Sequence, residues 1–134
     1  MPKMSEPMQA MVNNNQCFIA TVDAQGFPNI GPKTSTRVLD DEHLAFNEGT
    51  GGQTYANIQA NGIVLVAVVD RPNMVGYRFV GKGELVKEGS LYEAAREAMA
   101  ARGRPAPIAV VRISVEKIYD LKPGPTTAGK LIAE

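Results

Sequence analysis

Hydrophobic positions along this chain fall mostly into short runs of the kind found in β-strands. Six segments rich in β-branched and aromatic residues are bounded by glycine, proline, asparagine or aspartate, which predicts strands over residues 17–22, 28–39, 43–47, 62–70, 75–87 and 108–119. The most apolar run, residues 63–69, contains no polar side chain and is typical of a strand buried on both faces. We therefore expect Ile63, Leu65, Val66, Val68 and Val69 to be largely buried.

Three shorter stretches carry the residues that begin and end helices. Ser5 precedes Pro7 and a group of methionines, so it is expected to cap a first helix. Ser90 and Glu93 have the spacing of a capping box, which predicts another helix that continues to Arg102. The remaining helix is expected after a glycine-rich loop in the middle of the chain.

Together these elements predict a mainly β fold, a small six-stranded antiparallel barrel with short helices. The expected domain covers residues 1–122, and a Pro/Gly-rich tail over residues 123–134 packs either on its own barrel or on a partner. Pro32 lacks a backbone N–H, so its part of the second strand must lie at an edge or a bulge. Glycines within residues 75–87 are expected where that strand bends sharply.

The glycine-rich loop lies between the third strand and the most apolar one. Gly49, Gly51 and Gly52 allow close approach of a ligand, Thr54 is a candidate N-cap, and Gly62 supplies the left-handed stop of the following helix. Free backbone N–H groups and the positive end of the helix dipole suit a phosphate at this position. The alternative is a tight connection that needs glycine only for its geometry.

Composition narrows the choice of partners. The chain has 134 residues, a formal net charge of zero and one cysteine. Nucleic acids and anionic membranes attract proteins with a basic excess, so we expect neither as a partner. The longest apolar run is too short to cross a bilayer, and the N-terminus lacks the apolar segment of a signal peptide, so a cytoplasmic location is expected.

Three possible chemical motifs are weak. Residues 124–130 match the start of a nucleotide-binding P-loop, but Leu131 replaces the residue that binds magnesium. His43 follows acidic residues 40–42, yet consecutive turn residues rarely converge on one metal ion. Cys17 lies in an apolar strand and is interpreted as a small buried hydrophobe. No convincing nucleophile or general base remains, so any reactivity is expected to come from a cofactor.

Two groups of polar residues remain. Lys33 and Arg37 bound a hydroxyl-rich segment that can supply donors to a phosphorylated ligand together with the glycine-rich loop. Arg102 and Arg104 flank Gly103 at a helix end, where cations interact favourably with the helix dipole in any case. These two arginines are weak evidence for nucleic-acid binding.

An ordered series of segments resembles the flavin-binding split-barrel family, whose best-known class is pyridoxamine 5′-phosphate oxidase. Residues 18–28 resemble its first hairpin, and Gly31-Pro-Lys-Thr-Ser-Thr-Arg-Val-Leu-Asp-Asp resembles its flavin-facing second strand. Residues 43–49 and 53–64 resemble the strand, phosphate loop and helix that follow, and Ile118-Tyr-Asp-Leu-Lys-Pro-Gly resembles the common ending. The resemblance covers roughly residues 8–122 and implies a six-stranded split barrel of the FMN-binding type.

The resemblance also implies a ligand and an assembly. In such proteins FMN lies in a groove at a homodimer interface. The second strand would line the flavin, Phe46 and Asn47 would flank the ring or the ribityl chain, and residues 52–54 would meet the phosphate. The cofactor-binding residues implied in this way are Pro32, Lys33, Thr34, Ser35, Thr36, Phe46, Asn47, Gly52, Gln53 and Thr54. No catalytic side chain and no metal ligand are expected.

The chain departs from the family pattern in two places. Gln53 stands where the family usually has lysine or arginine, which would weaken anion binding by about 1 kcal/mol unless Lys33 or Arg37 compensates. The oxidase's C-terminal substrate motif ends in tryptophan, and this chain contains no tryptophan. The implied function is an FMN-binding redox protein or flavin-dependent oxidoreductase with a small-molecule or protein electron partner, and not vitamin B6 oxidation. The alternatives are a deazaflavin- or heme-binding split barrel and a non-catalytic dimeric ligand-binding barrel.

Overall fold

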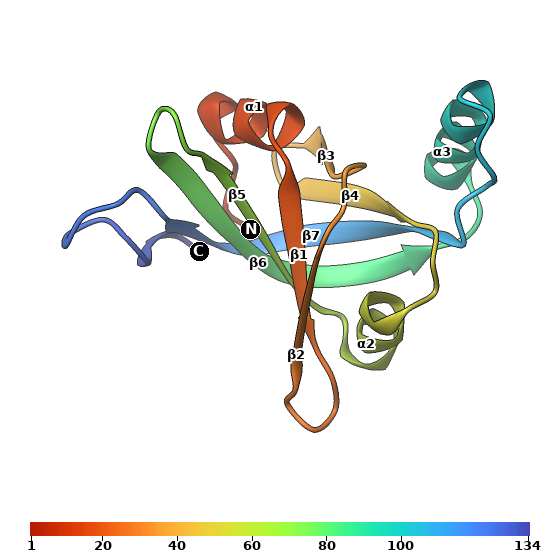
Figure 1. Ribbon diagram of the computed structural model, residues 1–134, viewed down its shortest axis with the longest axis horizontal. Coiled ribbons are helices and arrows are strands. Elements are labelled where there is room, and N and C mark those ends of the chain that lie inside the picture. The colour runs from red at the N-terminus through yellow and green to blue at the C-terminus, as the bar shows by residue number, and fades with distance from the viewer.

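The structure is a computed structural model that describes residues 1–134. Eight strands and three helices follow one another along the chain (Figure 1). Their bounds are α1 (Glu6–Asn14), β1 (Cys17–Val22), β2 (Pro28–Pro32), β3 (Arg37–Asp40), β4 (His43–Glu48), α2 (Gln53–Asn61), β5 (Ile63–Asp70), β6 (Val75–Val86), α3 (Ser90–Ala101), β7 (Ala109–Asp120) and β8 (Lys130–Ala133). The mainly β prediction is confirmed, although the strand count is eight and not six.

All strands pair antiparallel in one sheet of order β2-β1-β5-β6-β7-β4-β3, with β8 added to β7. The predicted strand over residues 28–39 is therefore two strands, β2 and β3, at opposite ends of this order. The chain turns between them because Thr36 donates both its amide and its hydroxyl to the Lys33 carbonyl, at 3.1 and 2.6 Å. Pro32 ends β2, in keeping with the expectation that this proline lies at an edge or a bulge.

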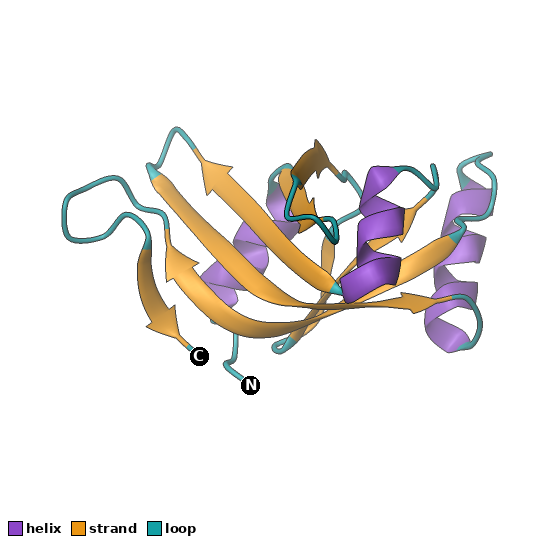
Figure 2. Ribbon diagram, turned by 90° about the horizontal axis from the view of Figure 1, so that it is seen from below, coloured by secondary structure: helices purple, strands orange, loops and turns teal.

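The sheet is strongly curved (Figure 2), and the core is built from buried side chains of β1, β4, β5, β6 and β7 together with helices α1 and α2. Val64, Val66 and Val68 of β5 are buried against Phe46 of β4 and Phe79 of β6. The prediction that both faces of residues 63–69 are buried is wrong, because Ile63 and Val69 are 43% and 56% exposed and Leu65 is half-buried. The other face of this strand is uncovered in a single chain.

Helix ends agree only partly with the sequence. Ser5 caps α1 by accepting from the Met8 amide, and Gly62 ends α2 in the left-handed region at φ +71°, as expected. Thr54 is not the cap of α2: Gly52 takes that position, and no side chain caps the helix. The capping box at α3 is also wrong, because Gly89 precedes the helix without a side-chain cap.

The predicted tail packs on its own sheet. Its last segment, β8, pairs with the end of β7, and the two chain termini lie near each other (Figures 1 and 2). The loop before β8 and helix α3 lie at opposite ends of the molecule. None of the three helices is long and apolar enough to cross a membrane.

Candidate functional site

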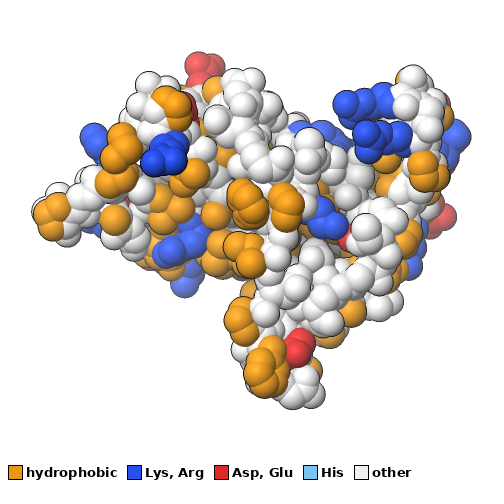
Figure 3. Space-filling view, viewed as in Figure 1, with side chains coloured by type: hydrophobic (Ala, Val, Ile, Leu, Met, Phe, Trp, Pro, Cys, Tyr) orange, Lys and Arg blue, Asp and Glu red, His pale blue; other side chains and the backbone are white.

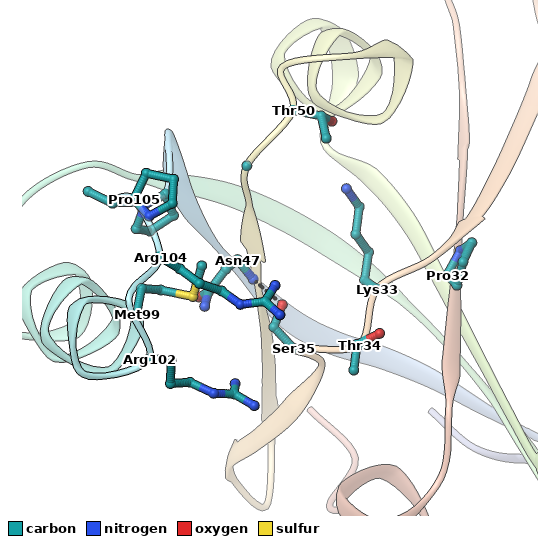
Figure 4. Close-up of a pocket in the computed structure, with 13 residues that line it drawn as sticks. Pro32, Lys33, Thr34, Ser35, Asn47, Thr50, Met99, Arg102, Arg104 and Pro105 are labelled. Atoms are coloured by element: carbon teal, nitrogen blue, oxygen red, sulfur yellow. Dashed lines mark hydrogen bonds between the residues drawn. The ribbon is translucent and has the colours of Figure 1, made fainter.

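A cavity of about 390 Å³ opens between two segments that are far apart in sequence (Figure 4). One side is the bend between β2 and β3 with the end of β4, and the other is the loop between α3 and β7. The lining residues are Pro32, Lys33, Thr34, Ser35, Asn47, Gly49, Thr50, Met99, Arg102, Arg104, Pro105, Ala106 and Pro107. The volume lies within the range of small-molecule sites.

The bend between β2 and β3 is held by backbone and hydroxyl contacts. The Lys33 amide donates to the Cys17 carbonyl at 3.1 Å, which ties the bend to β1. The Ser35 hydroxyl oxygen accepts from the Asn47 amide at 2.8 Å, which ties it to β4. The Thr34 hydroxyl contacts the side-chain oxygen of Gln16 at 3.2 Å. The Ser35 hydroxyl donates to no group of the chain, and Ser35 lines the cavity.

Lys33, which lines the cavity, forms an ion pair with a buried carboxylate behind the wall. Lys33 Nζ lies 2.9 and 3.3 Å from the two carboxylate oxygens of Glu48, and the Glu48 side chain is 0% exposed. The Thr50 hydroxyl also contacts this carboxylate, and Lys33 Nζ lies 5.7 Å from the centre of the Phe46 ring. The positive charge of Lys33 is therefore already matched by a charge of the protein itself.

Asn47 supplies the one buried side-chain atom that has no hydrogen-bond partner. Its Oδ1 is enclosed but accepts from no donor of the chain. The residue lines both the cavity and an adjoining apolar groove of about 340 Å³ beside α3. An enclosed acceptor without a donor costs about 1–3 kcal/mol, so a ligand N–H placed there would be favourable.

The opposite wall comes from the loop after α3. Gly103 takes the left-handed region at φ +70°, and the Arg104 amide returns to the Met99 carbonyl at 2.9 Å, which ends the helix. The Tyr92 hydroxyl donates to the Pro107 carbonyl at 2.8 Å and fixes the far end of the loop. Arg102 and Arg104 extend from this loop toward the bend (Figure 4).

From the sequence, these two arginines were interpreted as helix-end cations and as weak evidence for nucleic-acid binding. Neither has an ion pair or a side-chain hydrogen bond to the protein. Their place in the cavity depends on how β7 brings the loop back beside β4, where the Ile108 amide donates to the Glu48 carbonyl at 2.8 Å. Two arginines around a glycine after a helix were the available signal, but the sequence does not show what they face.

Of the ten residues implied by the resemblance, the structure brings five together on the cavity wall: Pro32, Lys33, Thr34, Ser35 and Asn47. The other five, Thr36, Phe46, Gly52, Gln53 and Thr54, do not line it. The hydroxyl of Thr36 is used in the bend, and Phe46 is 0% exposed, so its side chain belongs to the core. The ligand roles of all ten residues stay predictions.

The weak chemical candidates lie elsewhere. His43 Nδ1 is 2.8 Å from an Asp40 carboxylate oxygen, away from the cavity, and no group of three potential ligands is close enough to hold a metal ion. Cys17 is 1% exposed, and burial raises the pKa of its thiol to about 11. A thiol that stays protonated at neutral pH is a poor nucleophile, in line with the interpretation of Cys17 as a buried hydrophobe.

Two solved structures share this architecture, and a third protein is similar in sequence. Group A Streptococcus HupZ is 46% identical, with a TM-score of 0.83 over 90% of this chain and 96% of that one. A putative pyridoxamine 5′-phosphate oxidase from Lactobacillus delbrueckii is 32% identical, with a TM-score of 0.76 over 87% and 93% of the two chains. An uncharacterised protein of Methanocaldococcus jannaschii is 33% identical over 98% of this chain and 89% of its own length.

More distant structures share the fold alone. They include an FMN-binding protein from Syntrophomonas wolfei at 17% identity and TM-score 0.73. An F420 reductase has 20% identity and TM-score 0.64, and HutZ, a heme storage protein from Vibrio cholerae, has 16% and 0.66. These likenesses confirm the split-barrel class. The family model for pyridoxamine 5′-phosphate oxidase matches residues 4–122, and the chain belongs to this family.

Proposed function

We propose that this protein is an FMN-binding flavoprotein that acts as a redox protein or a flavin-dependent oxidoreductase, with a small-molecule or protein electron partner. Bound FMN would supply the electron transfer, for which the chain has no reactive side chain of its own in the cavity. The proposal places this activity in the cytoplasm, where a lone thiol such as Cys17 stays reduced.

The observation that best supports the proposal is that Asn47 Oδ1 has no hydrogen-bond partner in the chain. A flavin ring presents an N–H between two carbonyl groups, so it can donate to this acceptor and accept from neighbouring donors. The free hydroxyl proton of Ser35 is one such donor on the same wall. Matching an enclosed acceptor with a ligand donor removes the cost of leaving it unpaired.

Heme is less well matched to this cavity. Heme iron is held by histidine, cysteine, methionine or tyrosine. Among the lining residues only Met99 has such a side chain, and the single histidine, His43, does not line the cavity. A deazaflavin shares much of the flavin chemistry, so it remains the alternative that the geometry separates least from FMN.

The absorption spectrum of the purified protein tests the ligand class. We expect the two visible bands of an oxidised flavin, either as purified or after FMN is added and the excess removed. Mass spectrometry of the released ligand then distinguishes FMN from a deazaflavin. A Soret band, or a colourless protein that added FMN does not fill, would contradict the proposal.

The proposal includes a homodimer. The outer face of the sheet at β2, β1 and β5 is apolar: Phe18 lies opposite Pro32 and Ala67, and Ala20 lies opposite Ile30 and Leu65. Figure 3 shows hydrophobic side chains gathered over these strands. Because Pro32 also lines the cavity, a second copy seated on this face would border the ligand.

Substituting Phe18 with glutamate is expected to convert the dimer to a monomer, because Phe18 is 43% exposed in the single chain and lies in the middle of the apolar face. A charge buried at such an interface without a partner is strongly unfavourable. Sedimentation at micromolar concentration measures the change. Ile132 of β8, equally exposed at 43%, provides the control as Ile132→Glu, which should remain dimeric. A monomeric wild type that still binds flavin would contradict the dimer.

A further inference from the structure

We propose that Arg102 and Arg104 hold the phosphate of the bound cofactor, which assigns phosphate binding to the loop between α3 and β7. The inference rests on the proposed function, because the anion in question is the phosphate of FMN. It differs from the expectation drawn from the resemblance, in which the glycine-rich loop at Gly52 to Thr54 meets the phosphate.

The charges around the cavity favour the two arginines. The wall contains three cations, Lys33, Arg102 and Arg104, and no acidic side chain. Lys33 is already paired with the buried carboxylate of Glu48 at 2.9 Å. The uncompensated positive charge of the cavity is therefore the charge of the two arginines, and a phosphate dianion matches it in sign and in size.

The glycine-rich loop, by contrast, has its side chains engaged in the fold. Gln53 donates to Asn57 Oδ1 at 2.6 Å, and Asn57 in turn donates to the Thr21 hydroxyl at 3.0 Å. Thr54 is 8% exposed, and its hydroxyl accepts from Asn29 at 3.1 Å. These contacts pin α2 against β1 and β2, so the side chains of Gln53 and Thr54 stabilise the packing of the helix.

The loop after α3 is built to present the two arginines. Gly103 in the left-handed region separates them, and the hydrogen bonds from the Arg104 amide and the Tyr92 hydroxyl fix both ends of the turn. Figure 4 shows the Arg104 guanidinium directed from the loop toward Ser35, while Arg102 extends from the same loop along the same wall of the cavity. The planar fork of guanidinium donors suits phosphate oxygens. A role limited to the helix dipole would not require side chains directed across a cavity.

Comparing FMN with riboflavin tests this inference, because the two ligands differ only in the phosphate. Both affinities are measured by quenching of flavin fluorescence in the wild type, R102Q/R104Q, R96Q and Q53E. Arg96 lies on the exposed side of α3 and pairs with Glu93 at 2.7 Å, so R96Q is the matched control. Q53E tests the glycine-rich loop as the competing phosphate site.

We expect the wild type to prefer FMN over riboflavin, and the preference to fall by about tenfold or more in R102Q/R104Q, since hydrogen bonds to charged groups are the strong ones. Riboflavin affinity should change little, and R96Q and Q53E should keep the wild-type preference. A preference that survives in R102Q/R104Q, or that disappears in Q53E, would overturn the inference and leave the proposed function standing. If the wild type binds neither flavin, the proposed function fails, and this inference fails with it.

Discussion

Replacing Gly81 with alanine is expected to destabilise the protein by about 3 kcal/mol, because the strand has no room for a Cβ there. Gly81 lies in β6 at the point where the register with β7 shifts. A Cβ at this position would overlap the backbone carbonyl oxygen of Ser114 and lie 3.3 Å from a methyl group of Ile113. Since β6 and β7 are the longest strands and lie at the centre of the sheet, the backbone cannot yield without disturbing the core.

Chemical denaturation of Gly81→Ala and of a control, Gly31→Ala, measures this effect. Gly31 also lies in a strand, but a Cβ there would meet no atom within 4 Å, so its substitution should change the free energy of unfolding by less than about 1 kcal/mol. Equal and small losses in the two variants would show that β6 and β7 are not packed as described.

Removing the amine of Lys33 in Lys33→Met is expected to cost about 3 kcal/mol of folding stability. The substitution leaves the Glu48 carboxylate, which is 0% exposed, without its charged partner. Breaking a buried pair from one side is costly because the remaining charge has lost both water and its counter-charge. The double variant Lys33→Met/Glu48→Met should recover most of the loss, since an apolar replacement of both partners leaves no buried charge.

Thermal or urea unfolding of the single and double variants tests this expectation. The exposed pair between Lys3 and Asp41, with atoms 3.9 Å apart and side chains 72% and 46% exposed, supplies the comparison. Lys3→Met should cost less than about 1 kcal/mol. If Lys33→Met and Lys3→Met cost the same, the Lys33–Glu48 pair is not buried in solution.

The sequence was informative wherever local pattern decides structure. The β-branched run after Gly62 and the left-handed stop at Gly62, with φ +71°, were both recognised because strand propensity and turn geometry act over a few residues. The same pattern did not say which face of β5 would be covered. Val64 and Val69 look alike in sequence, yet one is 0% and the other 56% exposed, because burial depends on which distant elements of the fold pack against each face.

The missing N-cap of α2 follows from a contact with a distant residue, and the strand break follows from a turn within a segment that looks like a strand. Thr54 resembles an N-cap, but its hydroxyl accepts a hydrogen bond from the side chain of Asn29, 25 residues away in the chain. The break between β2 and β3 follows from Thr36 bonding back to Lys33, a turn hidden within an otherwise strand-like segment. Local propensity could not weigh these competing contacts.

Only one wall of the candidate site was identified from the sequence. Residues 32–35 and Asn47 were identified through the resemblance and line the cavity. Arg102 and Arg104 were missed because their position requires α3 to end beside the bend between β2 and β3, more than 60 residues earlier in the chain. A contact of such long range leaves no periodic or spacing signal in a single sequence.

Titration of FMN into the wild type and Ala106→Trp, followed by flavin fluorescence, tests most directly whether the cavity binds FMN. Ala106 is exposed and lines the cavity of about 390 Å³, so an indole there would fill space that the ligand needs, with little cost to the fold. Ala128→Trp, in the loop at the opposite end of the molecule, is the control. We predict that FMN binds the wild type and Ala128→Trp alike and Ala106→Trp at least about tenfold more weakly, a loss of about 1.4 kcal/mol. Equal affinity of all three proteins for FMN, or no binding to the wild type, would contradict the assignment of this cavity as the flavin site.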